Sequence, residues 1–114
     1  MSIKTNGEIK PVSESGFLRD DKTDKLNFDL IPVWFIERLA RLYTDGAKAR
    51  GKNNWLLASN EKDLESFRES AWRHFIQYMK GHTDEDHMAA VVFNLVGSEY
   101  VKDKIANKIQ STGK

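Results

Sequence analysis

Three polar side chains fall at the borders of apolar helical stripes, and two of them, His87 and Asn94, share an edge that would face a cleft. His74 borders the stripe of one predicted helix, and His87 and Asn94 border the stripe of the next. At 100° per residue, their spacing brings His87 and Asn94 within about 20° of each other. An imidazole titrates near neutral pH and can orient or deprotonate a water molecule. His87, His74 and Asn94 are therefore candidate catalytic residues, with Asn94 able to hydrogen-bond a base, a sugar hydroxyl or a metal-bound water. The alternative is that such border residues only pack.

Asp84, Glu85 and Asp86 form an acidic run at the start of the second of these helices. One interpretation is structural, because acids in a first turn behind Thr83 as N-cap would offset the positive end of the helix dipole. The other is a Mg²⁺ site, with Mn²⁺ as a substitute, since hard cations prefer carboxylate oxygens and neutralise phosphate charge. Asp84 and Glu85 would then be the metal ligands, provided that a carboxylate or histidine on another helix faces them.

A basic cluster adjoins an asparagine and a tryptophan. Lys48, Arg50 and Lys52 offer cations for phosphate groups, and Asn54 and Trp55 offer an amide and an indole face for a base. The structural alternative is a solvated loop with Trp55 folded back into the core. The sequence contains no Walker loop, no Gly-x-Gly-x-x-Gly turn and no zinc signature, which argues against P-loop kinases and ATPases.

The apolar residues recur at helical spacing and do not alternate, which predicts an all-α fold. The first helix is expected to begin near Pro32, whose fixed φ suits a first turn. The second is expected to run from Ser59 or Asn60 to Met79, with Gly81 as a left-handed C-terminal cap. These two helices carry broad apolar faces and must pack against further helices.

Beyond the helix that Thr83 introduces, Gly97 and Ser98 predict the start of a fourth, weaker helix. The resulting organisation is a flexible polar N-terminal arm over residues 1–24, a helical domain of about four helices over 25–109 and a loose tail over 110–114.

Composition narrows the class of protein. A chain of 114 residues with 39% hydrophobic residues is expected to form one globular domain. A net charge of +1 provides no field to attract a nucleic acid polymer or an anionic membrane. With no cysteine and no apolar run long enough to cross a bilayer, we expect a cytoplasmic protein.

The spaced polar positions, taken in order from Lys25 to Val96, resemble the amino-terminal domain family of dATP/dGTP diphosphohydrolases, relatives of the all-α MazG-type nucleotide pyrophosphohydrolases. Where the family usually has glutamate after the glycine and a second histidine, this chain has His82 and Ala90. The matching positions are Lys25, Asp29 to Pro32, Gly46-Ala47-Lys48, Asn54-Trp55, Arg73-His74, Gly81, Asp84, His87 and Asn94.

The resemblance implies a compact MazG-like domain that hydrolyses a purine deoxynucleoside triphosphate to the monophosphate and pyrophosphate. Such an enzyme would adjust the nucleotide pool in a bacterial cytoplasm, that of the host if a phage encodes it. Lys25, Lys48 and Arg73 would bind the phosphates of the substrate. Asn54 and Trp55 would also bind the substrate. The alternative is an inactive relative that binds a nucleotide or a host protein through the same cleft. Because so few helices leave apolar surface uncovered, a homo-oligomer is also expected.

Overall fold

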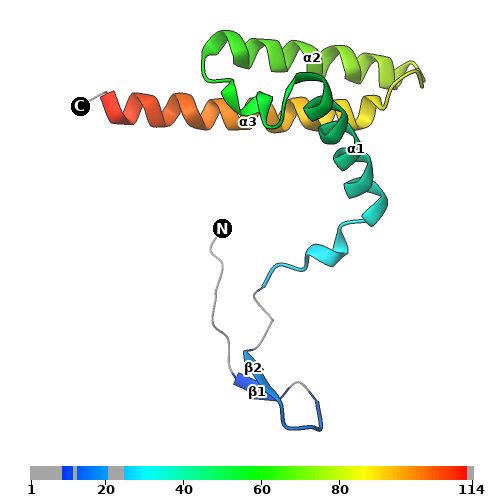
Figure 1. Ribbon diagram of the computed structural model, residues 1–114, viewed down its shortest axis with the longest axis vertical. Coiled ribbons are helices and arrows are strands. Elements are labelled where there is room, and N and C mark those ends of the chain that lie inside the picture. The colour runs from blue at the N-terminus through cyan, green and yellow to red at the C-terminus, as the bar shows by residue number, and fades with distance from the viewer. Residues whose placement is uncertain (1–8, 12, 21–24, 113–114) are drawn as a thin grey trace. The chain divides into compact units, whose positions relative to one another are not determined.

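The computed structural model describes residues 9–11, 13–20 and 25–112. The chain divides into two units, one up to Pro32 and the other from Val33 onward. The helical unit confirms the all-α prediction (Figure 1). The elements are β1 (Ile9–Pro11), β2 (Leu18–Asp20), the 3-10 helix η1 (Phe28–Leu30), α1 (Val33–Arg50), the 3-10 helix η2 (Asn54–Leu57), α2 (Glu61–Met79) and α3 (His87–Thr112).

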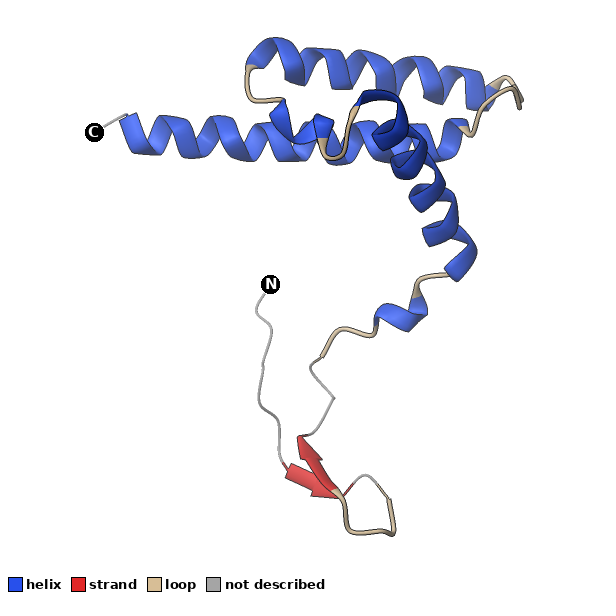
Figure 2. Ribbon diagram, viewed as in Figure 1, coloured by secondary structure: helices blue, strands red, loops and turns tan. Residues whose placement is uncertain are grey.

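The first unit contains a short hairpin that the sequence analysis did not predict (Figure 2). β1 and β2 pair antiparallel, with Ile9 opposite Asp20 and Pro11 opposite Leu18. Gly16 in the connection has a φ of 86°, a conformation that glycine adopts without strain. Strands of three residues are too short to show an alternating pattern in the sequence. Residues 1–8, 12 and 21–24 of the predicted arm and residues 113–114 of the predicted tail lie outside the described residues.

The ends of α2 are fixed as the sequence predicts. At its start, the Asn60 side chain accepts a hydrogen bond from the Asp63 amide at 2.9 Å. At its end, Gly81 has a φ of 80° and its amide donates to the Tyr78 carbonyl, while the His82 amide donates to the Gln77 carbonyl. This pair of bonds is the Schellman arrangement, which stops the helix and turns the chain toward α3.

The start of α3 differs from the prediction. Asp86, rather than Thr83, is the cap: its carbonyl accepts from the Ala90 amide at 3.0 Å, and its Oδ1 accepts from the Ala89 amide at 3.1 Å. Asp84 and Glu85 consequently lie in the loop before the helix and not in its first turn. The directions of their side chains therefore do not follow the helical periodicity that the sequence analysis assumed.

The predicted fourth helix does not exist as a separate element, because α3 continues without a break through Gly97 and Ser98 to Thr112. The expected loose tail is thus helical as far as Thr112. Gly97 marks a close approach of α2 and α3: a Cβ at this position would lie 2.6 Å from Cζ of Phe67. The glycine is a packing residue and not a helix boundary.

An aromatic cluster joins all the elements of the helical unit. Tyr43 of α1 and Phe93 of α3 have ring centroids 5.1 Å apart, and Trp55 of η2 lies 5.1 Å from Tyr100 of α3. Phe67 of α2 completes the cluster against Phe93. Edge-on contacts between aromatic rings stabilise the fold by more than the burial of their apolar area alone would. Burial also raises the pKa of the Tyr43 hydroxyl.

α2 and α3 lie side by side and run antiparallel, and α1 packs on α3 (Figure 1). The most buried apolar side chains come from this α2–α3 contact and its surroundings: Leu64, Ala71, Ala89, Ala90 and Val101. Among the described residues, no helix is both long and apolar enough to cross a membrane.

Candidate functional site

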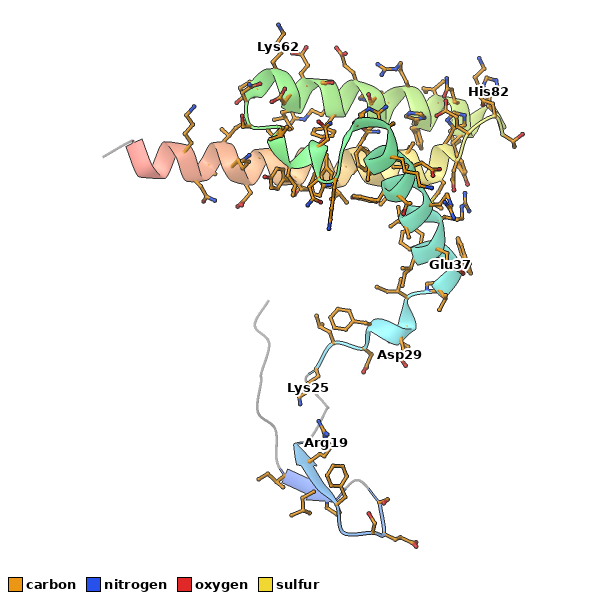
Figure 3. All side chains as sticks on the ribbon, viewed as in Figure 1. Arg19, Lys25, Asp29, Glu37, Lys62 and His82 are labelled. Atoms are coloured by element: carbon orange, nitrogen blue, oxygen red, sulfur yellow. The ribbon has the colours of Figure 1, made fainter. Side chains whose placement is uncertain are left out.

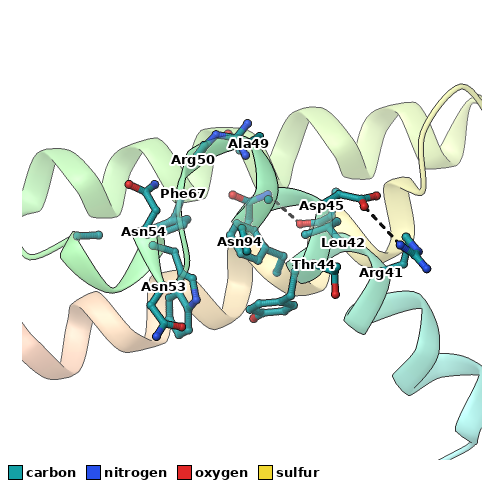
Figure 4. Close-up of a pocket in the computed structure, with 18 of the residues that line it drawn as sticks. Arg41, Leu42, Thr44, Asp45, Ala49, Arg50, Asn53, Asn54, Phe67 and Asn94 are labelled. Atoms are coloured by element: carbon teal, nitrogen blue, oxygen red, sulfur yellow. Dashed lines mark hydrogen bonds and ion pairs between the residues drawn. The ribbon is translucent and has the colours of Figure 1, made fainter.

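A groove of about 1430 Å³ runs between α1, η2, α2 and α3 (Figure 4). One wall is formed by the second half of α1 and the turn that follows it, and the other by α2 and the first half of α3. Positive backbone φ at Gly51 and Asn53, 97° and 63°, lets the chain turn tightly at the end of α1. This turn places η2 beside the groove.

The groove wall carries four cationic side chains, of which two are paired. Arg38 is bound by Asp86, and Arg41 lies 3.5 Å from Asp45, a pair that Figure 4 marks with a dashed line. Arg50 and Lys52 have no ion-pair partner among the described residues. These two are the cations that an anionic ligand could engage without breaking an existing pair.

Two of the three phosphate-binding residues expected from the resemblance, Lys48 and Arg73, do not line the groove. Lys48 is exposed and does not line the groove, because it projects from another side of α1. Arg73 is exposed on α2, and its Nη2 donates to Ser70 Oγ at 2.9 Å. Lys25, labelled in Figure 3, belongs to the other unit of the chain. Within the described chain, only Arg50 and Lys52 of the cations weighed in the sequence analysis line the groove.

Asn54 and Trp55, the two residues expected to contact a base, both line the groove. Trp55 is half-buried and packs edge-on against Tyr43 and Tyr100, so it also plugs the core. The Tyr100 hydroxyl donates to the Leu56 carbonyl at 2.8 Å, which fastens η2 to α3. The two interpretations of Trp55 are therefore compatible, since one ring both packs and borders the groove.

The two histidines meet between α2 and α3. His74 Nδ1 lies 2.9 Å from His87 Nδ1, and His87 Nε2 lies 2.9 Å from Asp84 Oδ1. His87 is only 2% exposed and does not line the groove, so the expectation that it faces the cleft is wrong. His74 is half-buried and does line it. Of the two predicted imidazoles, His74 is the one that a groove ligand can reach.

Asn94 is 7% exposed and lines the groove. Its Nδ2 donates to the Ala90 carbonyl at 2.8 Å, one turn earlier in α3. The amide nitrogen is therefore engaged by the helix backbone, and Oδ1 is the atom left to accept a hydrogen bond. A base amino group or a sugar hydroxyl could donate to it.

The acidic run does not fit a resident magnesium ion. Asp84 Oδ1 accepts from His87, which lowers the pKa of the Asp84 carboxyl, and Asp86 is taken up by Arg38. Glu85 is exposed and borders the groove. Nowhere in the described chain do three carboxylate or imidazole groups converge as a metal site would need. The predicted ligand pair, Asp84 and Glu85, therefore lacks the facing group that it required.

Sequence reasoning missed the role of Arg38 and Asp86. Arg38 binds both oxygens of Asp86, and this raises the pKa of the guanidinium and lowers that of the carboxyl. The residues are far apart in the sequence, so no local pattern connects them. In the sequence, Arg38 is one of several basic residues of α1 and looks like an ordinary solvated residue.

The comparisons with known proteins agree with the resemblance seen in the sequence. No curated protein and no solved structure matches the chain. A family model described as dATP/dGTP diphosphohydrolase, N-terminal, matches residues 15–108. This range contains the whole groove and both histidines. The chain therefore belongs to the dATP/dGTP diphosphohydrolase N-terminal family.

Proposed function

We propose that this chain hydrolyses a purine deoxynucleoside triphosphate, dATP or dGTP, to the monophosphate and pyrophosphate. The observation that carries the proposal is one groove lined by two cations without an ion-pair partner among the described residues, by the rings of Tyr43, Trp55 and Phe93, and by the His74 imidazole. Membership of the family supports the choice of reaction and of substrate class.

Different parts of the groove suit different parts of the substrate. Arg50 at the end of α1 and Lys52 in the turn that follows it suit the phosphate oxygens, because neither has an ion-pair partner among the described residues and a charged donor makes a strong hydrogen bond to phosphate. Asn54 and Trp55 of η2 suit the base and sugar. Ser66, Ser70 and His74 recur every four residues along α2, so one face of that helix borders the groove.

In this proposal, Mg²⁺ binds together with the nucleotide and not to the free protein. Mg²⁺ in nucleotide enzymes is bound by one or two carboxylates together with substrate phosphates. The described chain has no converged set of side chains that could hold a resident ion. Mg²⁺, or Mn²⁺ in its place, remains a prediction for the substrate complex.

The decisive experiment is a survey of substrates. Purified protein is incubated with each deoxy- and ribonucleoside triphosphate plus Mg²⁺ or Mn²⁺, and pyrophosphate and monophosphate are measured. We expect both products from dATP or dGTP, and none with EDTA or with the Arg50→Gln/Lys52→Gln double variant. Phosphate release in place of pyrophosphate would contradict the proposal.

A second candidate is binding without turnover, by a relative that has lost activity and holds a nucleotide or a host protein in the same groove. The observations that favour it are His82 and Ala90, where the family usually has glutamate and histidine. Calorimetric binding of dATP or dGTP without pyrophosphate release in any metal would select this candidate.

We also propose that the chain forms a homo-oligomer through the outer face of α2. Trp72, Ile76 and Met79 recur along that helix at 66%, 48% and 65% exposure, with Phe75 beside them. A continuous apolar stripe of this kind marks an association surface. Sedimentation of wild type and of Trp72→Glu/Met79→Glu is the test, with Lys62→Glu as a control on the exposed start of α2. The double variant should be monomeric, and an unchanged mass would place the interface elsewhere.

A further inference from the structure

Asp84, His87 and His74 form a hydrogen-bonded chain that runs from solvent to the groove. The Asp84 side chain is 69% exposed, the His87 side chain is 1% exposed, and His74 lines the groove. Each link is 2.9 Å long: Asp84 Oδ1 to His87 Nε2, and His87 Nδ1 to His74 Nδ1. Among the described residues, His74 Nε2 has no hydrogen-bond partner.

The links determine which ring nitrogens carry protons. The pKa of the Asp84 carboxyl is lowered by its hydrogen bond to His87, so it is ionised at neutral pH and can only accept. His87 Nε2 must therefore carry a proton, and in a neutral ring its Nδ1 is then bare. The bond between the two Nδ1 atoms requires one proton, which His74 must supply. With both rings neutral, His74 Nε2 is left as a bare, basic nitrogen.

We propose that His74 Nε2 is the general base that takes the proton from the attacking water, and that Asp84 and His87 are positioning residues that hold His74 in its Nδ1–H form. This inference rests on the proposed hydrolysis. The water oxygen forms a bond to the α-phosphorus while the bond from the α-phosphorus to the bridging oxygen breaks. The pyrophosphate leaves with that electron pair, and the water proton moves to Nε2.

The same chain stabilises the charge that forms. Once Nε2 is protonated, His74 is an imidazolium whose Nδ1–H still donates to His87 Nδ1. If that proton crosses the 2.9 Å bond, the positive charge moves to His87, directly beside the Asp84 carboxylate. A buried imidazole between a base and an anion thus orients the base and spreads its charge.

The tautomers can be measured without any turnover. Long-range ¹H–¹⁵N correlation spectra of protein with ¹⁵N-labelled histidine distinguish protonated from bare ring nitrogens. We expect a bare Nε2 in His74 and a bare Nδ1 in His87. His82, exposed in the loop between α2 and α3 (Figure 3), is the internal reference for an unconstrained ring. In Asp84→Ala, His74 should shift toward the pattern of His82, whereas Glu65→Ala should leave it unchanged. A protonated His74 Nε2 in the neutral wild-type protein would overturn the proposal.

Kinetics test the role in catalysis. His74→Asn retains an amide that can donate to His87 but has no basic nitrogen, so kcat should fall by about 10²–10⁴-fold with little change in KM. Asp84→Ala should lower kcat by about 10–100-fold, the range for removing a partner that fixes a histidine tautomer. The control Glu65→Ala lies on the exposed face of α2 and should retain full activity.

Each outcome separates this inference from the proposed function. If wild type releases pyrophosphate and His74→Asn keeps its kcat, the base is another group although the function stands. If KM alone rises in His74→Asn, His74 is a binding residue and the base assignment is wrong. If wild type releases no pyrophosphate from any nucleotide, both the function and the base role fall, whatever tautomer the spectra show.

Discussion

Arg38 on α1 binds both carboxylate oxygens of Asp86 at the start of α3, with Nε 2.8 Å from Oδ2 and Nη2 2.6 Å from Oδ1. The same Oδ1 caps α3 through the Ala89 amide. One carboxylate thus fixes the beginning of a helix and ties a second helix to it. His87, whose ring contacts His74, follows Asp86 directly and is the first residue of the helix that this carboxylate caps.

Replacing Asp86 should therefore cost more than replacing its partner. We expect Asp86→Ala to lower the free energy of unfolding by about 1–2 kcal/mol, since it removes a cap as well as the ion pair. Arg38→Met should lower it by less than about 1 kcal/mol, because the pair is partly exposed to solvent and the cap remains. Urea unfolding of both variants measures the difference. A larger loss for Arg38→Met would mean that the cap contributes little.

The pair also predicts how stability depends on pH. The hydrogen bonds from Arg38 hold the pKa of Asp86 below its ordinary value. The folded state then binds fewer protons than the unfolded state, so this carboxylate stabilises the fold above its ordinary pKa of about 3.9. That contribution is lost as the pH falls through the lowered pKa. Asp86→Asn should flatten the acid limb of a plot of unfolding free energy against pH, and Asp103→Asn should not. Parallel acid limbs for wild type and Asp86→Asn would show that the pair has no such effect.

The sequence predicts the elements of this fold better than the contacts between them. Asn60 and Gly81 bound α2 because caps depend on a few neighbouring residues, and both predictions are confirmed. Gly97 was misinterpreted, because a helical glycine that admits a neighbouring ring looks the same in sequence as one that ends a helix.

The candidate site shows the same division between local and long-range information. The histidines and Asn94 were found from their helical periodicity, but that periodicity cannot say which imidazole borders the groove. That depends on how α2 and α3 face each other, and the structure places His74 outermost. Which cations line the groove depends on packing in the same way. Lys48 and Lys52 are both basic and close in sequence, yet of the two only Lys52 lines the groove.

The two helical glycines that lack positive φ should respond in opposite ways to alanine. Gly97→Ala should destabilise by about 1–3 kcal/mol, because its Cβ would overlap the Phe67 ring that packs on Phe93. Gly46→Ala should stabilise by about 0.4–1 kcal/mol, since its Cβ would lie 3.8 Å from the Arg50 Nη1 atom, an ordinary contact. Thermal unfolding compares them. The double variant Gly97→Ala/Phe67→Leu should recover part of the loss, and no recovery would mean that the ring is not the obstacle.

The last prediction decides between the phosphate-binding residues implied by the resemblance and those that the groove presents. Lys52 lines the groove without an ion-pair partner among the described residues, whereas Lys48 is exposed outside it. Lys52→Gln should weaken triphosphate binding by about 1–3 kcal/mol, the range for a lost charge-assisted hydrogen bond, and Arg50→Gln should do the same. Lys48→Gln and Arg73→Gln are the matched controls, with the same change of charge on α1 and α2.

Calorimetric titration of the four variants with dGTP and with deoxyguanosine separates the explanations. Loss for the triphosphate alone in Arg50→Gln and Lys52→Gln identifies a phosphate contact. Equal loss for both ligands would mean a distorted groove, because a nucleoside carries no phosphate for these cations to bind. Loss confined to Lys48→Gln or Arg73→Gln would place the triphosphate on the residues that the resemblance implies, and would show that the nucleotide does not lie in this groove.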